Sequence, residues 1–437
     1  MTGAATRLPR VAVLGVGSVG GVLAASLISA RKAEVHLISR GVGLKALKDT
    51  GLSVKTQENS EPISFTQQAG DFNVMSNGEA ERASAGLKMD YILVATKAHQ
   101  LTGSIDALTG LTHPGTAIVP CVNGMPWWLG RHILEAAGSS SVRLAACDPS
   151  GRLSSEINAS QILGSMSFIS GSVARDYSLW TSGWESSKNL LQLGDPGLGS
   201  DNDLGEKAEA LSGLFASLPS KDDEASRSSS SSSSSGGDGG GGGGGGRPVV
   251  PVACEVVPNI RSRIWDKLLV NCSINSITAL SSLTCGEVVD DPSSSELLQE
   301  VVDEVRAVGT KAMELNYDHR SSSSSSTSSS SSLPDTFSMD ADAILEKYRG
   351  TYGLKSSMQQ DVEAGRPTEK DPIVRSVLEL GARLGVPTPR LHVLACLLDA
   401  QDTAARNRAG LASFYGYSSM AMPEGRERRG KWGGAGS

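Results

Sequence analysis

The sequence predicts an α/β amino-terminal half, built on a doubly wound parallel sheet, and an all-helical carboxy-terminal half. Two observations predict this division. Up to about residue 258, short apolar runs alternate with helical patterns, whereas from Asn259 onward nearly the whole pattern is helical. The apolar runs are almost continuous, as expected for parallel strands that helices cover on both faces.

Four strand-like runs outline the amino-terminal sheet, at residues 11–14, 34–38, 91–96 and 117–122. A helix of small residues is expected at 21–30, after the first of these runs. Later in this half, residues 204–218 predict a helix. Residues 249–257 predict a strand, and Pro251 favours an edge position because proline cannot donate a ladder hydrogen bond.

Two low-complexity tracts interrupt the chain. One is a serine run at 228–235 followed by a glycine run that ends at Gly246, and the other is the serine-rich segment 321–332. Neither composition can bury enough apolar surface to become ordered. Both are predicted to be loop insertions, because the entropy of closing a loop grows only with the logarithm of its length. A phosphorylated regulatory segment is the alternative interpretation.

Composition limits the classes of function. A chain of 437 residues is long enough for two or three domains. The net charge is −7 and no large basic block is present, so nucleic-acid binding has no electrostatic support. No apolar run is long enough to span a membrane, so no membrane partner is expected. The first strand-like run begins at Val11, which leaves no room for a secretory signal before it.

Cysteine usage indicates a reducing compartment. The six cysteines form no CxxC pair and no metal-type spacing; they are Cys121, Cys147, Cys254, Cys272, Cys285 and Cys396. They are predicted to be reduced, buried thiols of an intracellular protein, and no metal site is expected. The cytoplasm is the expected location, with import into an organelle as the alternative.

A GxGxxG pattern follows the first predicted strand and consists of Gly15, Val16, Gly17, Ser18, Val19 and Gly20. By itself the pattern is weak, but a strand before it and a helix after it are the context that a dinucleotide site requires. Gly15 permits the tight turn, Gly17 lets a pyrophosphate approach, and Gly20 allows close packing of helix on strand. A Rossmann-type domain is therefore predicted, and a glycine-rich turn without a ligand is the alternative.

Polar residues beyond the strand ends suggest which dinucleotide binds. Arg40 ends the second predicted strand, where a site for NAD usually has an acidic residue. An arginine there favours a 2′-phosphate and hence NADP, and a solvated surface arginine is the alternative. Lys97 and Asn123 each follow a predicted strand, and ligands bind at the carboxyl ends of strands in open α/β sheets, so ligand contacts are favoured over ordinary loop positions.

A stripe of three polar residues lies on a helix predicted over 263–280, a stretch without proline or glycine. Lys267, Asn271 and Asn275 recur every four residues, so they drift by only about 40° per step around the helix. Their apolar neighbours, which predict burial on most sides, are Leu268, Leu269, Val270, Ile274 and Ile277. Buried polar groups are costly unless satisfied, and a polar small molecule would satisfy them. A structural network with backbone carbonyls is the alternative.

Five segments resemble the ketopantoate reductase (2-dehydropantoate 2-reductase) family. They are GVGSVG at 15–20, TKAHQ at 96–100, VNGM at 122–125, IWDKLLVNCSINSITAL at 264–280 and SSMQQDVEAGRPTE at 356–369. The last two are the specific ones, since many unrelated reductases share the first. The resemblance implies NADPH-dependent reduction of 2-dehydropantoate to pantoate, in pantothenate and coenzyme A biosynthesis.

The resemblance also implies roles for single residues. Lys267 matches the catalytic lysine, which donates the proton, and Glu369 matches an essential acid near cofactor and substrate. Asn271, Asn275 and Ser357 match substrate contacts. Lys97 and Asn123 match residues that face the nicotinamide and the substrate, and Asp361 matches a helix position close to the site. Without the resemblance, Glu369 and Asp361 would be interpreted as solvated charges, and Ser357 as a helix cap or surface hydroxyl.

Some positions depart from the family pattern. Cys285 and Gly286 stand where many members have Asn-Gly, which removes one polar contact, and Lys370-Asp371-Pro372 replaces the more usual Ile-Asp after Glu369. These departures bear on substrate fit. The alternative functions are a related NADPH reductase of another small 2-keto acid, and a non-catalytic NADPH-binding sensor. Since a sensor needs neither Lys267 nor Glu369, their presence argues against the second.

Three segments are predicted from these observations. Residues 1–258 form an NADP-binding Rossmann-type domain with an insertion at about 220–247. Residues 259–404 form a helical substrate and catalytic domain with an insertion at 321–332, and residues 405–437 form a disordered tail rich in glycine and arginine. The expected partners are a small-molecule 2-keto acid and, with the oligomeric state left open, a second copy of the chain in a homodimer.

Overall fold

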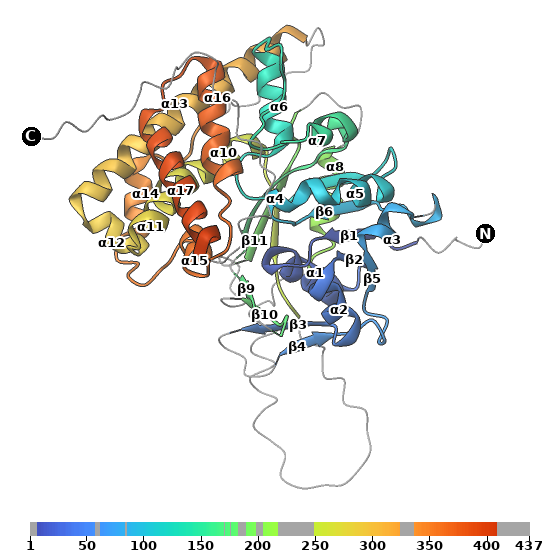
Figure 1. The fold of residues 1–437 in the computed structure, drawn as a ribbon. Coiled ribbons are helices and arrows are strands. Elements are labelled where there is room, and N and C mark those ends of the chain that lie inside the picture. Colours follow the sequence, from blue (N-terminus) through green and yellow to red (C-terminus); the bar gives the residue numbers. More distant parts are fainter. Residues whose placement is uncertain are drawn as a thin grey trace, which may run out of the picture.

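The amino-terminal part of the chain forms a five-stranded parallel sheet in the order β5-β2-β1-β6-β7 (Figure 1). A computed structural model shows it and describes residues 7–56, 62–83, 85–169, 171–174, 176–181, 189–197, 204–216, 249–323 and 336–408. The strands are β1 (Arg10–Leu14), β2 (Glu34–Ser39), β5 (Asn73–Ser76), β6 (Tyr91–Val94) and β7 (Ala117–Pro120). The strand order reverses between β1 and β6, which is where open α/β sheets bind ligands.

Helices cover both faces of this sheet, which explains why the central residues of its strands are mostly apolar. In β1, Val11 and Val13 belong to the core shared with α1 (Ser18–Ala30). Ala12 and Leu14 point into the opposite core, which also contains α5 (Ile105–Leu111) and the helical half. Further helices of this part are α2 (Gly41–Asp49), α3 (Asn77–Glu81), η1 (Ala85–Leu87), α4 (Ala98–Leu101), η2 (Thr102–Ser104), α6 (Trp127–Ala136), α7 (Arg152–Glu156) and η3 (Ala159–Gln161).

The four predicted strands of the sheet are present, with shifted ends. The last two stop two residues earlier than predicted, at Val94 and Pro120, because the chain turns there into the loops that carry Thr96 and Asn123. The first helix begins at Ser18 rather than at the predicted residue 21. Its first turn therefore includes the last three residues of the glycine motif.

Two smaller sheets lie beside the main one. The first has the order β4-β3-β10-β9, formed by β3 (Leu52–Thr56), β4 (Ile63–Phe65), β9 (Gly171–Val173) and β10 (Leu179–Thr181). The second has the order β12-β11-β8, formed by β8 (Gly164–Ile169), β11 (Asn189–Gly194) and β12 (Ala253–Val256), with α8 (Leu204–Ser212) packed on it. The amide of Leu163 donates to the carbonyl of Ile118 over 2.9 Å, which holds β8 beside β7.

Both predictions for this region are confirmed in outline. The edge strand predicted over 249–257 is β12, an edge strand of its sheet, and Pro251 precedes it. The helix predicted over 204–218 is α8, which ends at Ser212, and residues 217 and 218 lie outside the described residues. The serine run at 228–235 and the glycine run after it also lie outside them.

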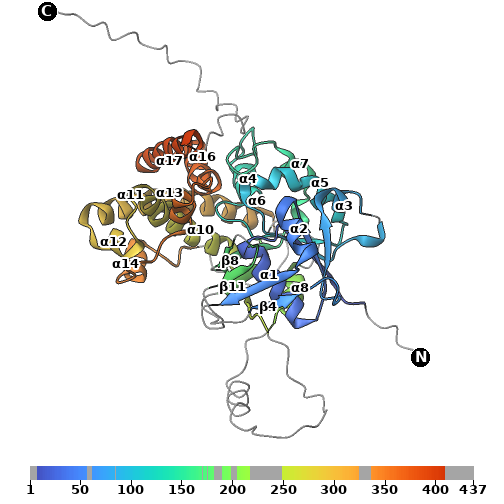
Figure 2. The same cartoon turned by 60° about the horizontal axis from the view of Figure 1, so that its bottom comes forward.

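The carboxy-terminal part is helical and lies beside the α/β part in both views (Figures 1 and 2). Its elements are α10 (Ile260–Val270), η4 (Asn271–Asn275), α11 (Ser276–Ser281), α12 (Cys285–Asp290), α13 (Pro292–Ser323), α14 (Ala341–Tyr348), α15 (Ser357–Glu363), η5 (Asp371–Arg375), α16 (Ser376–Leu384) and α17 (Pro389–Arg408). The predicted helix 263–280 is thus a continuous helical stretch, interrupted by a π-helical turn at η4. All five of its apolar flanking residues are buried.

Three sequence predictions for this part need correction. Residues 321–323 of the serine-rich segment continue α13 as helix, because a helix already formed extends at little cost through residues of moderate propensity. The helix α17 runs to Arg408, into the predicted tail, and residues 324–335 and 409–437 lie outside the described residues. Cys396 is exposed and Cys254 is partly exposed, whereas the other four cysteines are buried thiols. The three-segment division stays a prediction.

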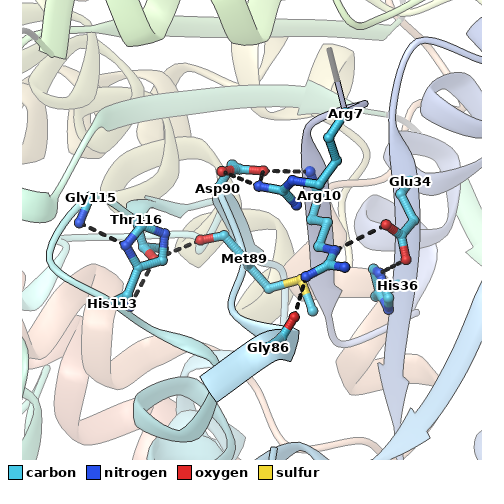
Figure 3. A network of polar contacts seen from close by, with 10 residues as sticks. All are labelled: Arg7, Arg10, Glu34, His36, Gly86, Met89, Asp90, His113, Gly115 and Thr116. Atoms are coloured by element: carbon cyan, nitrogen blue, oxygen red, sulfur yellow. Dashed lines mark hydrogen bonds and ion pairs between the residues drawn. The ribbon is translucent and has the colours of Figure 1, made fainter. Parts of the chain in front are cut away.

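A polar network joins the amino-terminal ends of the central strands (Figure 3). The Arg10 amide donates to Asp90 over 2.7 Å, and its guanidinium donates to Glu34 over 3.0 Å. The other oxygen of Glu34 lies 3.0 Å from Nε2 of His36, whose pKa burial lowers. These contacts join the starts of β1, β2 and β6 at one edge of the sheet. The opposite edge, where the carboxyl ends of the strands lie, carries the glycine motif.

Candidate functional site

The glycine motif has the geometry of a dinucleotide loop. Gly15 has a φ of +95°, and a Cβ there would lie 2.7 Å from the Thr96 Cγ2 atom. A Cβ on Gly20 would lie 2.0 Å from the Gly15 carbonyl oxygen and 2.9 Å from Ala95 Cβ. A Cβ on Gly17 would meet no atom within 4 Å. The first and third glycines are therefore required by packing, and the second faces open space where a phosphate can approach.

The surroundings of this loop also fit a dinucleotide. The Thr96 Oγ1 and His99 Nδ1 atoms are buried and have no hydrogen-bond partner in the part of the chain that the structure describes. Both follow β6, beside the reversal point of the strand order. Arg40 occupies the N-cap position of α2 without a capping hydrogen bond from its side chain, is exposed, and forms no ion pair with any described residue. A polar cofactor has donors and acceptors to offer these groups.

A chain of hydrogen bonds links the two parts of the molecule. The Lys267 ammonium on α10 donates to Asn123 Oδ1 over 3.0 Å and to the Ser167 carbonyl over 2.6 Å. Asn123 Nδ2 donates to Glu369 Oε2 over 3.0 Å. The other carboxylate oxygen of Glu369 accepts from the Ala98 amide over 3.4 Å. The side-chain amide of Asn123 therefore bridges Lys267 and Glu369, the lysine and the acid that the resemblance implies. Because Glu369 makes these hydrogen bonds, it is not a solvated charge.

The environment of Lys267 tunes its acidity. Burial lowers the pKa of Lys267 to about 8, although the carboxylate of Glu369 opposes this change. The nearby ammonium of Lys347 contributes to lowering it, since two like charges disfavour each other. The Lys267 ammonium also lies 5.5 Å from the ring centre of Phe168. An amine with this pKa is mostly protonated at neutral pH and can release its proton readily.

A second link between the two parts is ionic. Lys97 donates to Asp361 Oδ2 over 2.7 Å, and Arg366 donates to Asp361 Oδ1 over 2.7 Å. Asp361 is only 7% exposed, so the interpretation as a solvated charge is wrong. The two cations offset the cost of burying its carboxylate. Lys97 is thus directed from the end of β6 toward α15.

The loop that carries Asn123 is fixed by a close backbone contact. Gly124 has a φ of +86°, and a Cβ there would lie 2.3 Å from the Pro372 carbonyl oxygen. The Met125 amide donates to the same oxygen over 2.6 Å. This packing of the loop on η5 places Asn123 between Lys267 and Glu369. Lys370, one of the residues that depart from the family pattern, forms a 2.8 Å ion pair with Asp402 on α17.

A cavity of about 220 Å³ lies against the polar stripe. The residues that line it are Phe168, Asp266, Lys267, Val270, Asn271, Asn275, Cys285, Met339, Lys347, Tyr348, Leu354, Lys355, Ser356 and Ser357. Asn275 Nδ2 donates to Asn271 Oδ1 over 2.9 Å, so each amide keeps hydrogen-bonding capacity for another group. The cavity is therefore lined by all three residues of the polar stripe and by Ser357. It is also lined by Cys285, one of the residues that differ from the family pattern.

Two alternative interpretations are decided by this geometry. Ser357 is not the cap of α15, because the Ser356 hydroxyl accepts from the Gln359 amide over 3.1 Å and fills that role. Ser357 is exposed and lines the cavity. The structural-network interpretation of the stripe holds in part, since Lys267 binds the Ser167 carbonyl, yet all three stripe residues also face the cavity.

Sequence reasoning missed several residues around the cavity. The Ser167 carbonyl is a backbone acceptor, and the sequence carries no signal for it. Phe168 and Lys347 come from β8 and α14, which only the fold brings beside α10. Within the described residues there is no group of three side chains able to hold a metal ion, and no helix is long and apolar enough to cross a membrane.

Comparison with known proteins defines the class. The family model described as "Ketopantoate reductase PanE/ApbA" matches residues 11–138, and the one described as "Ketopantoate reductase PanE/ApbA C terminal" matches residues 259–402. The members are oxidoreductases that act on CH–OH groups with a pyridine nucleotide. The chain belongs to the ketopantoate reductase family.

Individual relatives agree with this assignment. The 2-dehydropantoate 2-reductase of Mesorhizobium japonicum is 26% identical over 390 residues, which cover 89% of this chain and 96% of the relative. The fold is shared with D-mandelate dehydrogenase in a complex with NADH and anilino(oxo)acetate, with a TM-score of 0.61 and 16% identity. It is also shared with the dimeric ketopantoate reductase of Staphylococcus aureus, with a TM-score of 0.55 and 18% identity. Each alignment with these structures covers 91% of this chain and 99% of the other.

Proposed function

We propose that this protein catalyses the NADPH-dependent reduction of 2-dehydropantoate to pantoate, a step of pantothenate and coenzyme A biosynthesis. The observation that carries the proposal is the position of Lys267. Lys267 lines the cavity, and its ammonium is hydrogen-bonded to Asn123, which follows a strand at the edge of the sheet that carries the glycine motif. A proton donor thus stands where a substrate and a nicotinamide would meet.

Bound NADPH would supply the hydride, and the protein residues manage charge and protons. Negative charge grows on the substrate's carbonyl oxygen as the ketone is reduced, and the Lys267 ammonium stabilises it and then transfers a proton from Nζ to that oxygen. A positioned proton donor typically contributes about 10²–10⁴-fold to the rate. Asn123 and the Ser167 carbonyl hold the amine in one orientation.

The other predicted residues orient the two ligands. Gly15, Val16, Gly17, Ser18, Val19 and Gly20 would hold the pyrophosphate at the start of α1, and Arg40 would bind the 2′-phosphate that distinguishes NADPH from NADH. Lys97, Asn123 and Glu369 would face the nicotinamide. Asn123, Asn271, Asn275 and Ser357 would hold the polar groups of the substrate by hydrogen bonds and so fix its orientation.

A direct assay tests the proposal. Loss of NADPH absorbance is followed with 2-dehydropantoate, and in parallel with 2-oxoisovalerate and phenylglyoxylate, which lack its hydroxyl group. We expect the highest kcat/KM with 2-dehydropantoate. A higher value with another 2-oxo acid would favour the related-reductase alternative, which Cys285 in the cavity supports, since a thiol is a weak hydrogen-bond partner for a hydroxyl. Binding of NADPH without turnover of any acid would favour the sensor.

We further propose a cytoplasmic homodimer. Its support is the dimeric Staphylococcus aureus enzyme of the same fold and the exposed apolar residues Val393 and Leu397 on α17, which are 56% and 49% exposed. Light scattering during gel filtration measures the mass of the particle. A mass equal to that of one chain would reject the dimer.

A further inference from the structure

The lining of the cavity contains three lysines, Lys267, Lys347 and Lys355, and one acid, Asp266. The Oδ1 atom of Asp266 accepts from the backbone amides of Ser338 and Met339 over 2.9 and 3.2 Å, and its Oδ2 atom forms a 3.8 Å ion pair with Arg263. Lys355 is paired with Glu363, with two contacts of 2.9 and 2.8 Å. Lys347 forms no ion pair with any residue in the described ranges. The charge on Lys347 is therefore available to a ligand.

Lys347 lines the cavity, and its ammonium lies beside two aromatic rings. Its ammonium lies 5.8 Å from the ring centre of Phe168 and 5.5 Å from that of Tyr348. Although the residue as a whole is exposed, the protein around its ammonium lowers the pKa of Lys347. The helix that carries it, α14, packs against α12 and α13 (Figures 1 and 2). The rings and the helix hold the cation in place without neutralising it.

Lys267 and Lys347 approach the same ring from different helices. Lys267 lies 5.5 Å from the centre of Phe168, so the two ammonium groups are separated by no more than the sum of their distances to it. Both residues line one cavity, and the charge on Lys347 disfavours the charge on Lys267, which is costly for the free protein. An anion between them would remove that cost.

We infer that Lys347 binds the carboxylate of the substrate and makes the cavity selective for 2-oxo acids over neutral ketones. This inference rests on the proposed function. The carbonyl and carboxylate carbons of a 2-oxo acid are directly bonded. A substrate whose carbonyl oxygen meets Lys267 therefore has its carboxylate within a few ångströms of that oxygen, and among the other described cations of the lining Lys347 is the one without an ion pair. Asn271, Asn275 and Ser357 are neutral and cannot balance that charge. Lys347 is a binding residue here, and the proton still comes from Lys267.

The test replaces Lys347 with methionine, which keeps the length of the side chain and removes its charge. With the holoenzyme, we expect the Lys347→Met variant to raise the KM for the 2-oxo acid by about 10- to 100-fold, the range for a lost charge-assisted hydrogen bond. The kcat at saturation and the KM for NADPH should change far less. The matched control is Lys355→Met, since Lys355 lines the same cavity but is already paired with Glu363.

A neutral substrate separates charge recognition from a structural effect. The wild-type protein should prefer the acid to the primary amide of the same 2-oxo acid, and Lys347→Met should lose most of that preference. A merely structural role would weaken turnover of acid and amide equally. Equal acid-to-amide ratios in the wild-type protein and the variant, or an unchanged KM for the acid, would overturn the inference.

A binding measurement keeps this test independent of the proposed function. If no 2-oxo acid is reduced, titration calorimetry of the NADP⁺-loaded protein with oxamate, an unreactive analogue of a 2-oxo acid, replaces the kinetic assay. Weaker oxamate binding in Lys347→Met but not in Lys355→Met would support the anion site although the proposed reaction had failed. No oxamate binding by the wild-type protein, or equal binding by the protein and the variant, would reject it.

Discussion

The Nζ atom of Lys267 lies 3.0 Å from the Oδ1 atom of Asn123, although the two residues are far apart in the sequence. One lies on a helix of the carboxy-terminal part and the other in a loop at the edge of the amino-terminal sheet. Because Asn123 Oδ1 accepts from the ammonium, its amide nitrogen is free to donate to Glu369. The position of the amine is therefore set by both parts of the molecule.

Removal of the amine tests the proposed proton donor. Lys267→Met should lower kcat by about 10²–10⁴-fold, because the variant has no positioned acid near the carbonyl oxygen. Stopped-flow measurement of a single turnover isolates the chemical step. The melting temperature should change little, since the gain from no longer burying a charge is opposed by the loss of the hydrogen bonds to Asn123 and the Ser167 carbonyl. A kcat within about twofold of the wild-type value would remove Lys267 from the mechanism.

The pH dependence of kcat/KM should report the acidity of Lys267. The ammonium is the active form, so kcat/KM should fall as the pH rises through about 8, where the buried amine loses its proton. The groups that face this amine are Glu369, the Cys121 thiol and Lys347. Loss of the like charge in Lys347→Met should move the fall to higher pH. Loss of the opposite charge in Glu369→Gln should move the fall in kcat/KM to lower pH. The same pH profile for the wild-type protein and both variants would contradict the assignment of this fall to Lys267.

Arg40 should decide between the two nicotinamide cofactors. Arg40→Ala should weaken NADPH by about tenfold or more and leave NADH nearly unchanged, because only NADPH has a 2′-phosphate for the guanidinium. Fluorescence titration gives both dissociation constants. Lys45→Ala, on the same helix, is the control, since Lys45 already pairs with Asp49. An equal loss for both cofactors would show that Arg40 does not read the 2′-phosphate.

The backbone contact at Gly124 should matter more than its conformation alone. Gly124→Ala places a methyl group 2.3 Å from the Pro372 carbonyl oxygen and also strains a φ of +86°. Gly138→Ala is the matched control, with a φ of +64° and no atom within 4 Å. Both should lose about 1 kcal/mol of unfolding free energy to strain, and Gly124→Ala should lose more and also lose turnover. Chemical denaturation measures the unfolding free energy of both variants. Equal losses would show that the contact with Pro372 does not contribute to stability.

The sheet and the polar stripe could be predicted from the sequence because each leaves a local pattern. Continuous apolar runs indicate strands covered on both faces, and Gly15, Gly17 and Gly20 occur at the end of one of them. The spacing of Lys267, Asn271 and Asn275 likewise survives in the structure as one wall of a cavity. The resemblance added Glu369, which by itself has no local signal.

The rest of the site depends on contacts between distant segments. Lys267 donates to the backbone carbonyl of Ser167. Every residue has such a carbonyl, so the identity of the residue at position 167 gives no signal for this contact. Lys347 lies on a short surface helix, where a lysine in the sequence ordinarily predicts a side chain exposed to solvent. The π-helical form of Asn271–Asn275 is set by packing, since η4 lies against η5 and the Cys272 thiol donates to the Ile373 carbonyl. None of these relations has a fixed spacing in the sequence.

The π-helical turn at η4 lets this segment hold one residue more than a regular helix would. Five residues there occupy a turn that an ordinary helix completes in fewer. Deleting one of them would let a regular helix form and would leave the residues after it nearly in their present orientation, since four α-helical residues turn by about 400°, close to the turn of five π-helical ones. Asn275 would then still face the cavity. A variant that loses one codon here should therefore keep more activity than one that loses a codon within α10, and alignments of distant relatives should place a one-residue gap at η4 rather than in the regular helices beside it.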